Sequence, residues 1–162
     1  MKHFFLILII PLFLYSCINS IKRNKAHDYN NKINDNLVVY INKIEDDESL
    51  LFRKALKREL EEAFKKVNVN AEILIIEDLT KLQNINQHNF LELYIEQKSL
   101  KQTNKSRLSE FIFTLKDPYI GKPVWKALIP VYYVPTNEKF LNSSAKSTSK
   151  YIIKVLQLDK LL

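Results

Sequence analysis

An amphipathic helix between two strand patterns limits the folds open to this chain of 162 residues. From Leu50 to Val67, apolar residues recur every three or four positions, as in a helix that buries one side. The preceding segment, Leu37–Ile44, is β-branched and alternating, and the following one, Ala71–Leu79, is a continuous apolar run. We therefore predict parallel strands joined by a right-handed helical crossover, with Ala71–Leu79 as a central strand buried on both faces.

The rest of the chain predicts three further strands and a second helix. The strand patterns cover Phe90–Ser99, Glu110–Leu115 and Val124–Val134, and we expect them to form an antiparallel meander. Pro130 cannot donate to a ladder, so its strand is expected at an edge or bulged there. Ser143 or Ser144 is expected to cap a final helix that runs to about Leu158. The predicted fold class is α+β, a mixed and mostly antiparallel four- to five-stranded sheet with two helices packed on one face.

The first sixteen residues have the layout of a secretory signal peptide. Lys2 and His3 precede an apolar run, Phe4–Tyr15, which ends before the small residue Ser16. The run has about 12 residues, whereas a membrane-spanning helix needs roughly 20. We therefore predict that residues 1–16 are removed on export.

The sequence Leu14-Tyr15-Ser16-Cys17 resembles the lipobox of bacterial lipoproteins. The resemblance implies cleavage before Cys17, a diacylglycerol on the Cys17 thiol, and acylation of the new amino terminus by a fatty acid such as palmitate. Two or three acyl chains are enough for stable anchoring. Because residue 18 is Ile and not Asp, the sorting rule of such lipoproteins favours the outer membrane over the inner one. The periplasmic and the surface side both stay open.

Residues 17–36 are predicted to be the lipidated cysteine and a flexible tether, and residues 37–162 a single α+β domain. The tether is polar and rich in Asn and Lys, which is typical of a solvated spacer. Its basic residues could instead touch anionic headgroups near the acyl chains. These basic residues are Lys22, Arg23 and Lys25.

Composition excludes several classes of site. The net charge is +7, and cleavage removes Lys2 alone and leaves +6. An exported protein meets anionic lipids, cell-wall polymers and acidic partners in place of nucleic acid, although excess Lys can also serve solubility alone. The single glycine argues against phosphate-binding loops and nucleophile elbows. His88 stands alone in the folded part, so no metal, cofactor or catalytic function is expected. An acid pair such as Glu92 and Glu110 is the remaining enzymatic alternative.

The hairpin around the single glycine carries a second resemblance. Asp117, Gly121 and Trp125 are similar to the Asp-x-x-x-Gly-x-x-x-Trp hairpin of periplasmic TolB N-terminal regions and of lipoprotein activators of penicillin-binding proteins. The predicted order of strands and helices is similar too. The resemblance covers Leu37–Leu162 and implies the small α+β domain of those proteins.

We interpret the chain as a non-catalytic envelope lipoprotein that docks on another envelope protein or a cell-wall polymer. Aromatic residues anchor interfaces, and a basic cluster suits an anionic partner. For Trp125 and Tyr133, core packing is the favoured alternative. A second hypothesis is a carrier or sensor of a small apolar ligand held between helices and sheet. The candidate contacts are Tyr119, Trp125, Tyr132, Tyr133, Lys98, Lys101, Lys105 and Arg107.

Overall fold

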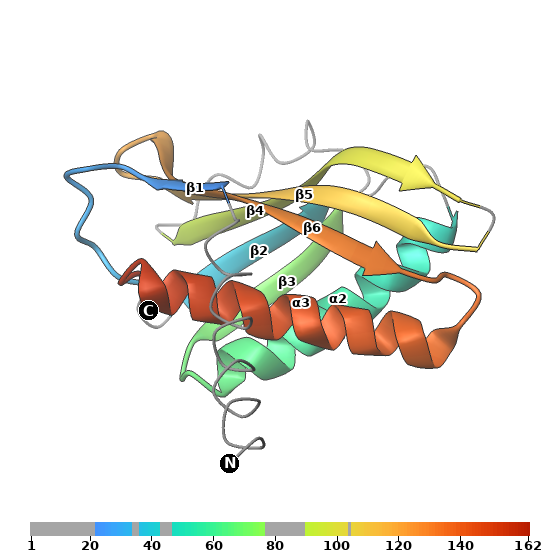
Figure 1. Cartoon of the computed structure of the whole chain (residues 1–162). Helices are drawn as coiled ribbons and strands as arrows, with labels where there is room; N and C mark the ends of the chain where they lie inside the picture. The colour runs from blue at the N-terminus through green and yellow to red at the C-terminus, as the bar shows by residue number, and fades with distance from the viewer. Residues whose placement is uncertain (1–21, 34–35, 43–46, 77–89, 104) are drawn as a thin grey trace, which may run out of the picture.

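A six-stranded mixed sheet carries both helices of the computed structural model (Figure 1), which describes residues 22–33, 36–42, 47–76, 90–103 and 105–162. The predicted signal peptide, Cys17 and His88 lie outside these residues. No helix in the described ranges is long and apolar enough to cross a membrane. The elements are β1 (Lys22–Lys25), β2 (Asn36–Asn42), α2 (Asp47–Lys65), β3 (Asn70–Ile76), β4 (Leu91–Gln102), β5 (Arg107–Asp117), β6 (Lys122–Tyr133) and α3 (Glu138–Leu158).

The strand order is β1-β6-β5-β4-β2-β3. Strand β2 pairs in parallel with both β3 and β4, while β4, β5 and β6 form an antiparallel meander. The parallel strand–helix–strand unit and the meander are therefore confirmed. The central position expected for Ala71–Leu79 is wrong, because β3 lies at the edge of the sheet and most of its side chains are only half-buried. An apolar run does not distinguish a central strand from an edge strand that a helix covers.

A sixth strand comes from the segment expected to be a tether. Strand β1 pairs antiparallel with β6, from Lys22 opposite Leu128 to Lys25 opposite Trp125. Farther along the chain, the side chains of Tyr29 and Ile33 are each only 4% exposed and belong to the main core. Residues 22–33 therefore belong to the folded domain, which was expected to begin only at Leu37, and the predicted tether is wrong over these residues.

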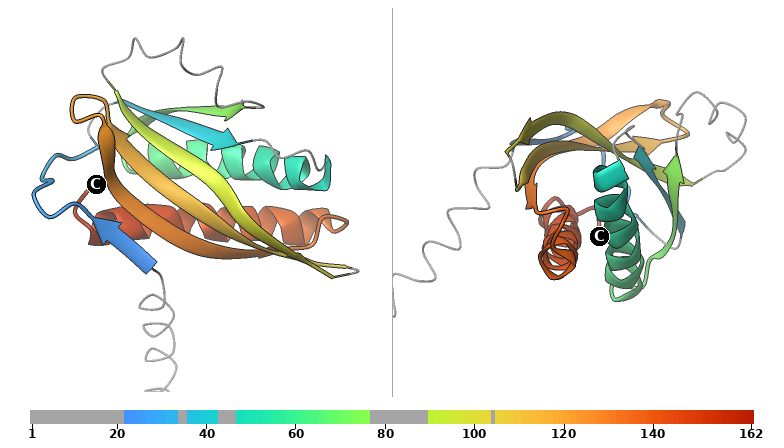
Figure 2. Two further views of the ribbon diagram at one scale, coloured as in Figure 1. Left: turned by 90° about the horizontal axis from the view of Figure 1, so that it is seen from above. Right: turned by 90° about the vertical axis from the view of Figure 1, so that its right-hand side faces the viewer.

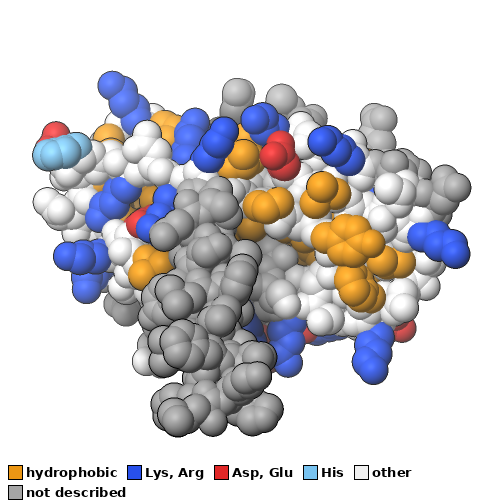
Figure 3. All heavy atoms as spheres, viewed as in Figure 1, with side chains coloured by type: hydrophobic (Ala, Val, Ile, Leu, Met, Phe, Trp, Pro, Cys, Tyr) orange, Lys and Arg blue, Asp and Glu red, His pale blue; other side chains and the backbone are white. Residues whose placement is uncertain are grey.

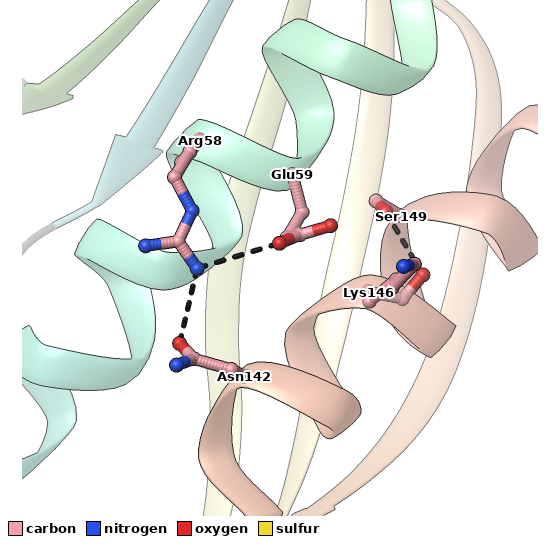
Figure 4. Close-up of polar contacts among 5 residues, drawn as sticks. All are labelled: Arg58, Glu59, Asn142, Lys146 and Ser149. Carbon is pink, nitrogen blue, oxygen red and sulfur yellow. Dashed lines mark hydrogen bonds and ion pairs between the residues drawn. The ribbon is translucent and has the colours of Figure 1, made fainter. Parts of the chain in front are cut away.

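Both helices cover the same face of the sheet, as predicted (Figure 2). The apolar stripe of α2 packs into the core, and Phe52 stacks on the Tyr133 ring at a centroid distance of 4.5 Å. Arg58 of α2 also donates from Nη2 to Glu59 Oε1 (3.4 Å) and to Asn142 Oδ1 of α3 (3.1 Å), a polar link between the helices (Figure 4). The buried residues of the α2 stripe are Phe52, Ala55, Leu56, Leu60, Ala63 and Phe64.

Helix α3 begins earlier than the Ser143 or Ser144 cap that the sequence suggested. Its N-cap is Asn137, whose side-chain oxygen accepts a hydrogen bond from the Phe140 amide at 3.0 Å. Asn is among the strongest capping residues, so the local chemistry explains the longer helix. The extra turn brings Phe140 beside β6.

Two carboxylates connect segments far apart in the chain: Asp117 at the end of β5 and Asp159 after α3. Asp117 accepts hydrogen bonds from the Tyr29 hydroxyl (3.2 Å), the Asn31 amide (3.4 Å) and the Tyr119 backbone N–H (2.9 Å). In the same turn Gly121 has a φ of +66°, where glycine is favoured. Asp159, directly after α3, accepts from Trp125 Nε1 at 2.7 Å. Arg23 Nε lies 3.6 Å from the other oxygen of Asp159.

Candidate functional site: the α3–β6 groove and the hairpin row

An open groove of about 500 Å³ lies between the outer part of β6 and α3. Strand β1 covers the outer edge of β6 only from Trp125 to Leu128, so the next residues of β6 border the groove among the described elements. The prediction of an edge at Pro130 is confirmed in this sense. We call this feature the α3–β6 groove. Its lining residues are Ile129, Pro130, Val131, Tyr132, Phe140, Ser143, Ser144, Ser147, Thr148 and Tyr151.

Two exposed aromatic side chains form one end of the α3–β6 groove. The rings of Tyr132 and Phe140 meet edge to face, with centroids 5.6 Å apart, and are 49% and 41% exposed. Such a pair supplies apolar contact area in a fixed geometry. The side of α3 that lines the groove carries small Ser and Thr side chains at three- and four-residue spacing, which leave the space of the groove open. The groove therefore combines an apolar floor with hydroxyl groups that can bind water or a polar partner.

A row of side chains crosses three strands beside this aromatic pair. Lys101 of β4 lies opposite Leu108 of β5, which lies opposite Tyr132 of β6. Directly opposed residues share a face of the sheet, so the three side chains stand next to one another. All three are exposed. We call them, together with Lys98 and Lys105 on the same β4–β5 hairpin, the hairpin row.

The structure brings together some of the predicted contact residues and separates the others. Tyr132, Lys98, Lys101 and Lys105 are exposed in the hairpin row. Tyr119 is 77% exposed but stands at the opposite end of β6, roughly 36 Å away at the usual rise of a strand. Tyr119 and Tyr132 therefore cannot contact one small ligand.

Three other candidates are buried. Trp125 and Tyr133 are 1% and 0% exposed and lie in the core, which agrees with the alternative favoured for them. Arg107, expected at the basic turn, is also buried. It is the first residue of β5 and lies opposite the buried Tyr133 of β6, on the face of the sheet that the helices cover. These three side chains support the fold and are not available to a partner.

Sequence reasoning missed Phe140 and the charge of α3. Helix α3 carries Lys139, Lys146, Lys150 and Lys154, all exposed, and its single acid is Glu138. On α2, by contrast, five acids balance five basic residues. The signal was present in the sequence as lysines spaced by seven, four and four positions, which places them on one side of the last helix. Figure 3 shows Lys and Arg side chains around the hydrophobic patch on the face of the molecule turned to the viewer in Figure 1.

A second aromatic cluster lies on the helix-free face of the sheet. Tyr40 and Tyr94 have ring centroids 5.1 Å apart, and Lys116 Nζ lies 4.0 Å from the Tyr94 ring centre. The Tyr94 hydroxyl donates to Glu92 Oε2 at 2.7 Å. Burial, followed by this hydrogen bond, raises the pKa of Tyr94 above its usual value of 10. The Tyr94 hydroxyl therefore stays protonated and serves as a structural donor.

The enzymatic alternative loses its acid pair. In the strand register, Glu92 of β4 lies opposite Lys116, and Glu110 of β5 lies opposite Ser99 of β4. Glu92 and Ser99 are seven positions apart, so the two acids are separated by roughly 23 Å at the usual rise of a strand. Paired carboxylates in glycoside hydrolysis lie less than about 10 Å apart. Glu92 and Glu110 therefore cannot act on one bond. Among the described residues, no group of three or more His, Cys, Asp or Glu side chains could hold a metal ion.

The chain matches no protein-family model and no curated protein sequence. Among solved structures it is similar to a PelC variant from Paraburkholderia phytofirmans, described as a dodecamer, with a TM-score of 0.50 and 12% identity over 82% of this chain and 95% of that one. Other similar structures are a minor lipoprotein from Acinetobacter baumannii (TM-score 0.41, 10% identity, 78% and 94% covered) and lipoprotein GNA1162 from Neisseria meningitidis (TM-score 0.41, 12% identity, 74% and 99% covered). Several of these neighbours are thus bacterial lipoproteins. The likeness to PelC is one of fold.

Proposed function

We propose that the protein is a lipid-anchored component of the bacterial cell envelope, acylated at Cys17 and held in the outer membrane. The observation that carries the proposal is the N-terminal sequence: an apolar run too short to span a bilayer, followed by Leu14-Tyr15-Ser16-Cys17. The first described element, β1, starts at Lys22, five residues after Cys17. Removal of residues 1–16 therefore leaves every described element of the fold in place.

Labelling cells with radioactive palmitate tests the anchor. We expect the label on the wild-type protein, which should fractionate with outer membranes. The Cys17→Ser variant should carry no label and leave the membrane fraction. Label on the variant, or an unlabelled wild-type protein, would overturn the proposal. Recovery of the labelled protein in the inner membrane would overturn only the choice of membrane.

The folded body is proposed to act as a non-catalytic docking module through the hairpin row. Lys98, Lys101 and Lys105 place three positive charges on one hairpin, and Leu108 and Tyr132 add exposed apolar surface beside them. Aromatic anchors with flanking charges are common at protein interfaces. An acidic protein surface or an anionic cell-wall polymer complements this arrangement.

Cross-linking in intact cells tests the docking proposal with two charge-matched variants. One replaces Lys98, Lys101 and Lys105 by Gln; the control replaces Lys54, Lys65 and Lys66, which are also exposed but belong to α2 and its C-terminal end. We expect a partner or wall fragment cross-linked to the wild-type chain and to the control, and a loss of at least tenfold in the hairpin variant. Equal yields from both variants, or no cross-linked species from the wild-type chain, would contradict the proposal.

The α3–β6 groove favours a second candidate function, the carriage of a small apolar ligand. It lies between a helix and the sheet, and its volume of about 500 Å³ falls within the range of ligand pockets. Native mass spectrometry of the Cys17→Ser chain should then retain a lipid-sized adduct. The Ser147→Phe variant, which places a large side chain in the groove, should lose it. An adduct that persists in this variant would place the ligand elsewhere.

A further inference from the structure

The anchor position restricts which side of the body can face the bilayer; this step rests on the proposed acylation of Cys17. Cys17 precedes Lys22 by five residues, and an extended chain spans at most about 3.5 Å per residue, so the acyl chains attach within about 18 Å of the Lys22 Cα. Lys22 pairs with Leu128 in the middle of β6. The side of the molecule that holds β1 and β6 is therefore kept close to the membrane surface.

Helix α3 runs along this same side. Trp125, near the start of β6, bonds to Asp159 just after the helix, and Tyr132, near the end of the strand, contacts Phe140 in the first turn. The helix therefore extends antiparallel to β6 for most of the length of the strand. Its exposed surface lies within reach of the anchor.

The exposed surface of α3 carries charge of one sign. Four exposed lysines occupy the outward side of the helix, and Lys22 adds a fifth from β1. The nearby acids are Glu138 and Asp159. The Asp159 carboxylate already accepts a hydrogen bond from Trp125 and forms an ion pair with Arg23. No comparable excess exists on α2. Each such lysine near an anionic bilayer contributes about 1 kcal/mol of attraction.

An exposed aromatic ring stands beside these lysines. Phe140 is 41% exposed at the end of the groove, and the half-buried Tyr151 lies three turns farther along the helix on the same side. Apolar side chains next to lysines are characteristic of helices that lie in the headgroup layer of a membrane. A fully apolar partner would leave the lysines unpaired, whereas an anionic headgroup layer satisfies both kinds of side chain.

We infer that the body does not hang freely from its anchor but lies with α3 on an anionic lipid bilayer. The docking face consists of Lys22, Lys139, Phe140, Lys146, Lys150 and Lys154. In this orientation the lysines bind headgroup phosphates, and Phe140 inserts between the lipids. The second edge of the sheet, β3, is turned away from the membrane.

Binding of the Cys17→Ser chain to lipid vesicles tests this inference without the acyl chains. Vesicles of phosphatidylglycerol mixed with phosphatidylcholine should sediment the protein, and pure phosphatidylcholine vesicles should not. Replacing Lys146, Lys150 and Lys154 by Gln should lower the partition coefficient on the order of 100-fold, since three contributions of about 1 kcal/mol are lost. Phe140→Ser should lower it about tenfold.

The controls are the Lys54, Lys65 and Lys66 triple variant and the exposed Ile120→Ser variant, both expected to bind like wild type. All sites are on the surface, and thermal melts verify that each variant is folded. Equal loss in the α3 and control triple variants, or binding indifferent to lipid charge, would overturn the inference. The inference would also be overturned if Phe140→Ser changed the self-association of the protein but left vesicle binding unchanged. Palmitate labelling without vesicle binding would support the anchor at Cys17 and contradict the proposed orientation. Vesicle binding without palmitate labelling would contradict only the anchor.

Discussion

At the scale of single residues, Asp117 and Asp159 connect parts of the chain that are far apart in sequence. Asp117 is 3% exposed and accepts from Tyr29 and Asn31, which lie 88 and 86 residues earlier in the chain. Asp159 binds Trp125 and Arg23 and thereby joins β6, β1 and the end of α3. A buried carboxylate is tolerated only where donors satisfy it, so Asp117 depends on correct placement of the segment that holds Tyr29 and Asn31.

Replacing Asp117 by Ala should lower the free energy of unfolding by about 2–4 kcal/mol, because the buried Tyr29 hydroxyl loses its acceptor and the bonds from Asn31 and the Tyr119 N–H are lost as well. Urea unfolding followed by circular dichroism measures the change. The matched control is Asp28→Ala, which removes a fully exposed carboxylate that contacts the neighbouring, equally exposed His27. The control should leave stability unchanged, since exposed ion pairs contribute little. A similar effect of both substitutions would mean that the Asp117 contacts are not specific.

Tyr29 should make stability fall at high pH. Burial, followed by the negative charge of Asp117, raises the pKa of Tyr29 above its usual value of 10. Above about pH 10 the Tyr29 hydroxyl loses its proton in the unfolded chain but keeps it in the folded chain, so the free energy of unfolding decreases as pH rises. In Tyr29→Phe this decrease should be smaller, with the remainder from Tyr94 and Tyr40. Urea titrations at stepped pH values from 8 to 11 check the slope; identical slopes would contradict the assignment.

At the scale of elements, β1 and the segment after it behave as part of the domain. The segment reads as polar and Asn-rich, yet Tyr29 and Ile33 are buried in the main core and Ile33 donates its N–H to the Leu161 carbonyl at 2.7 Å. Two apolar side chains among many polar ones are enough to dock a segment when the backbone also finds partners.

Ile33→Ala distinguishes a docked segment from a tether. It should destabilise the fold by about 2–4 kcal/mol, which is usual for truncating a buried aliphatic side chain. In a free tether the same change would have no effect. Ile120→Ala, at a half-exposed position of the β5–β6 turn, should stay within about 0.5 kcal/mol of wild type in the same denaturation experiment.

Most of the helices and strands could be predicted from local patterns. The α2 stripe, the parallel β2–α2–β3 unit and the β4–β5–β6 meander follow from periodicity and chain order. The position of β3 at the edge and the addition of β1 could not, because both depend on which strands pair across the sheet. In the site, Tyr132 and the hairpin lysines could be predicted as contacts, because aromatic residues anchor interfaces and clustered lysines suit an anionic partner. Phe140 was missed because its loop was expected to end later, and Arg107 was misplaced because a charged residue at a turn usually stays in solvent.

At the scale of the whole molecule, the inferred orientation makes a prediction about chemical access. The chain has one cysteine, Cys17, so a cysteine introduced in the Cys17→Ser background reports on its own surroundings. Ser143→Cys lies on exposed α3, and Glu61→Cys lies on exposed α2. Anionic vesicles should slow maleimide labelling at position 143 by about tenfold or more and leave position 61 unchanged. Equal protection at the two positions would indicate that the body adopts no fixed orientation on the membrane.

The placement of β1 also determines how the protein responds to mechanical load. Tension applied between the proposed acyl chains on Cys17 and a bound partner reaches the described residues at Lys22, so the first described bonds to carry it are those of β1 with β6 and of Arg23 and Lys25 with Asp159. This four-residue strand can detach while the other five strands remain paired. It would lengthen the connection to the membrane before the domain itself unravels, and so serve as a mechanical fuse.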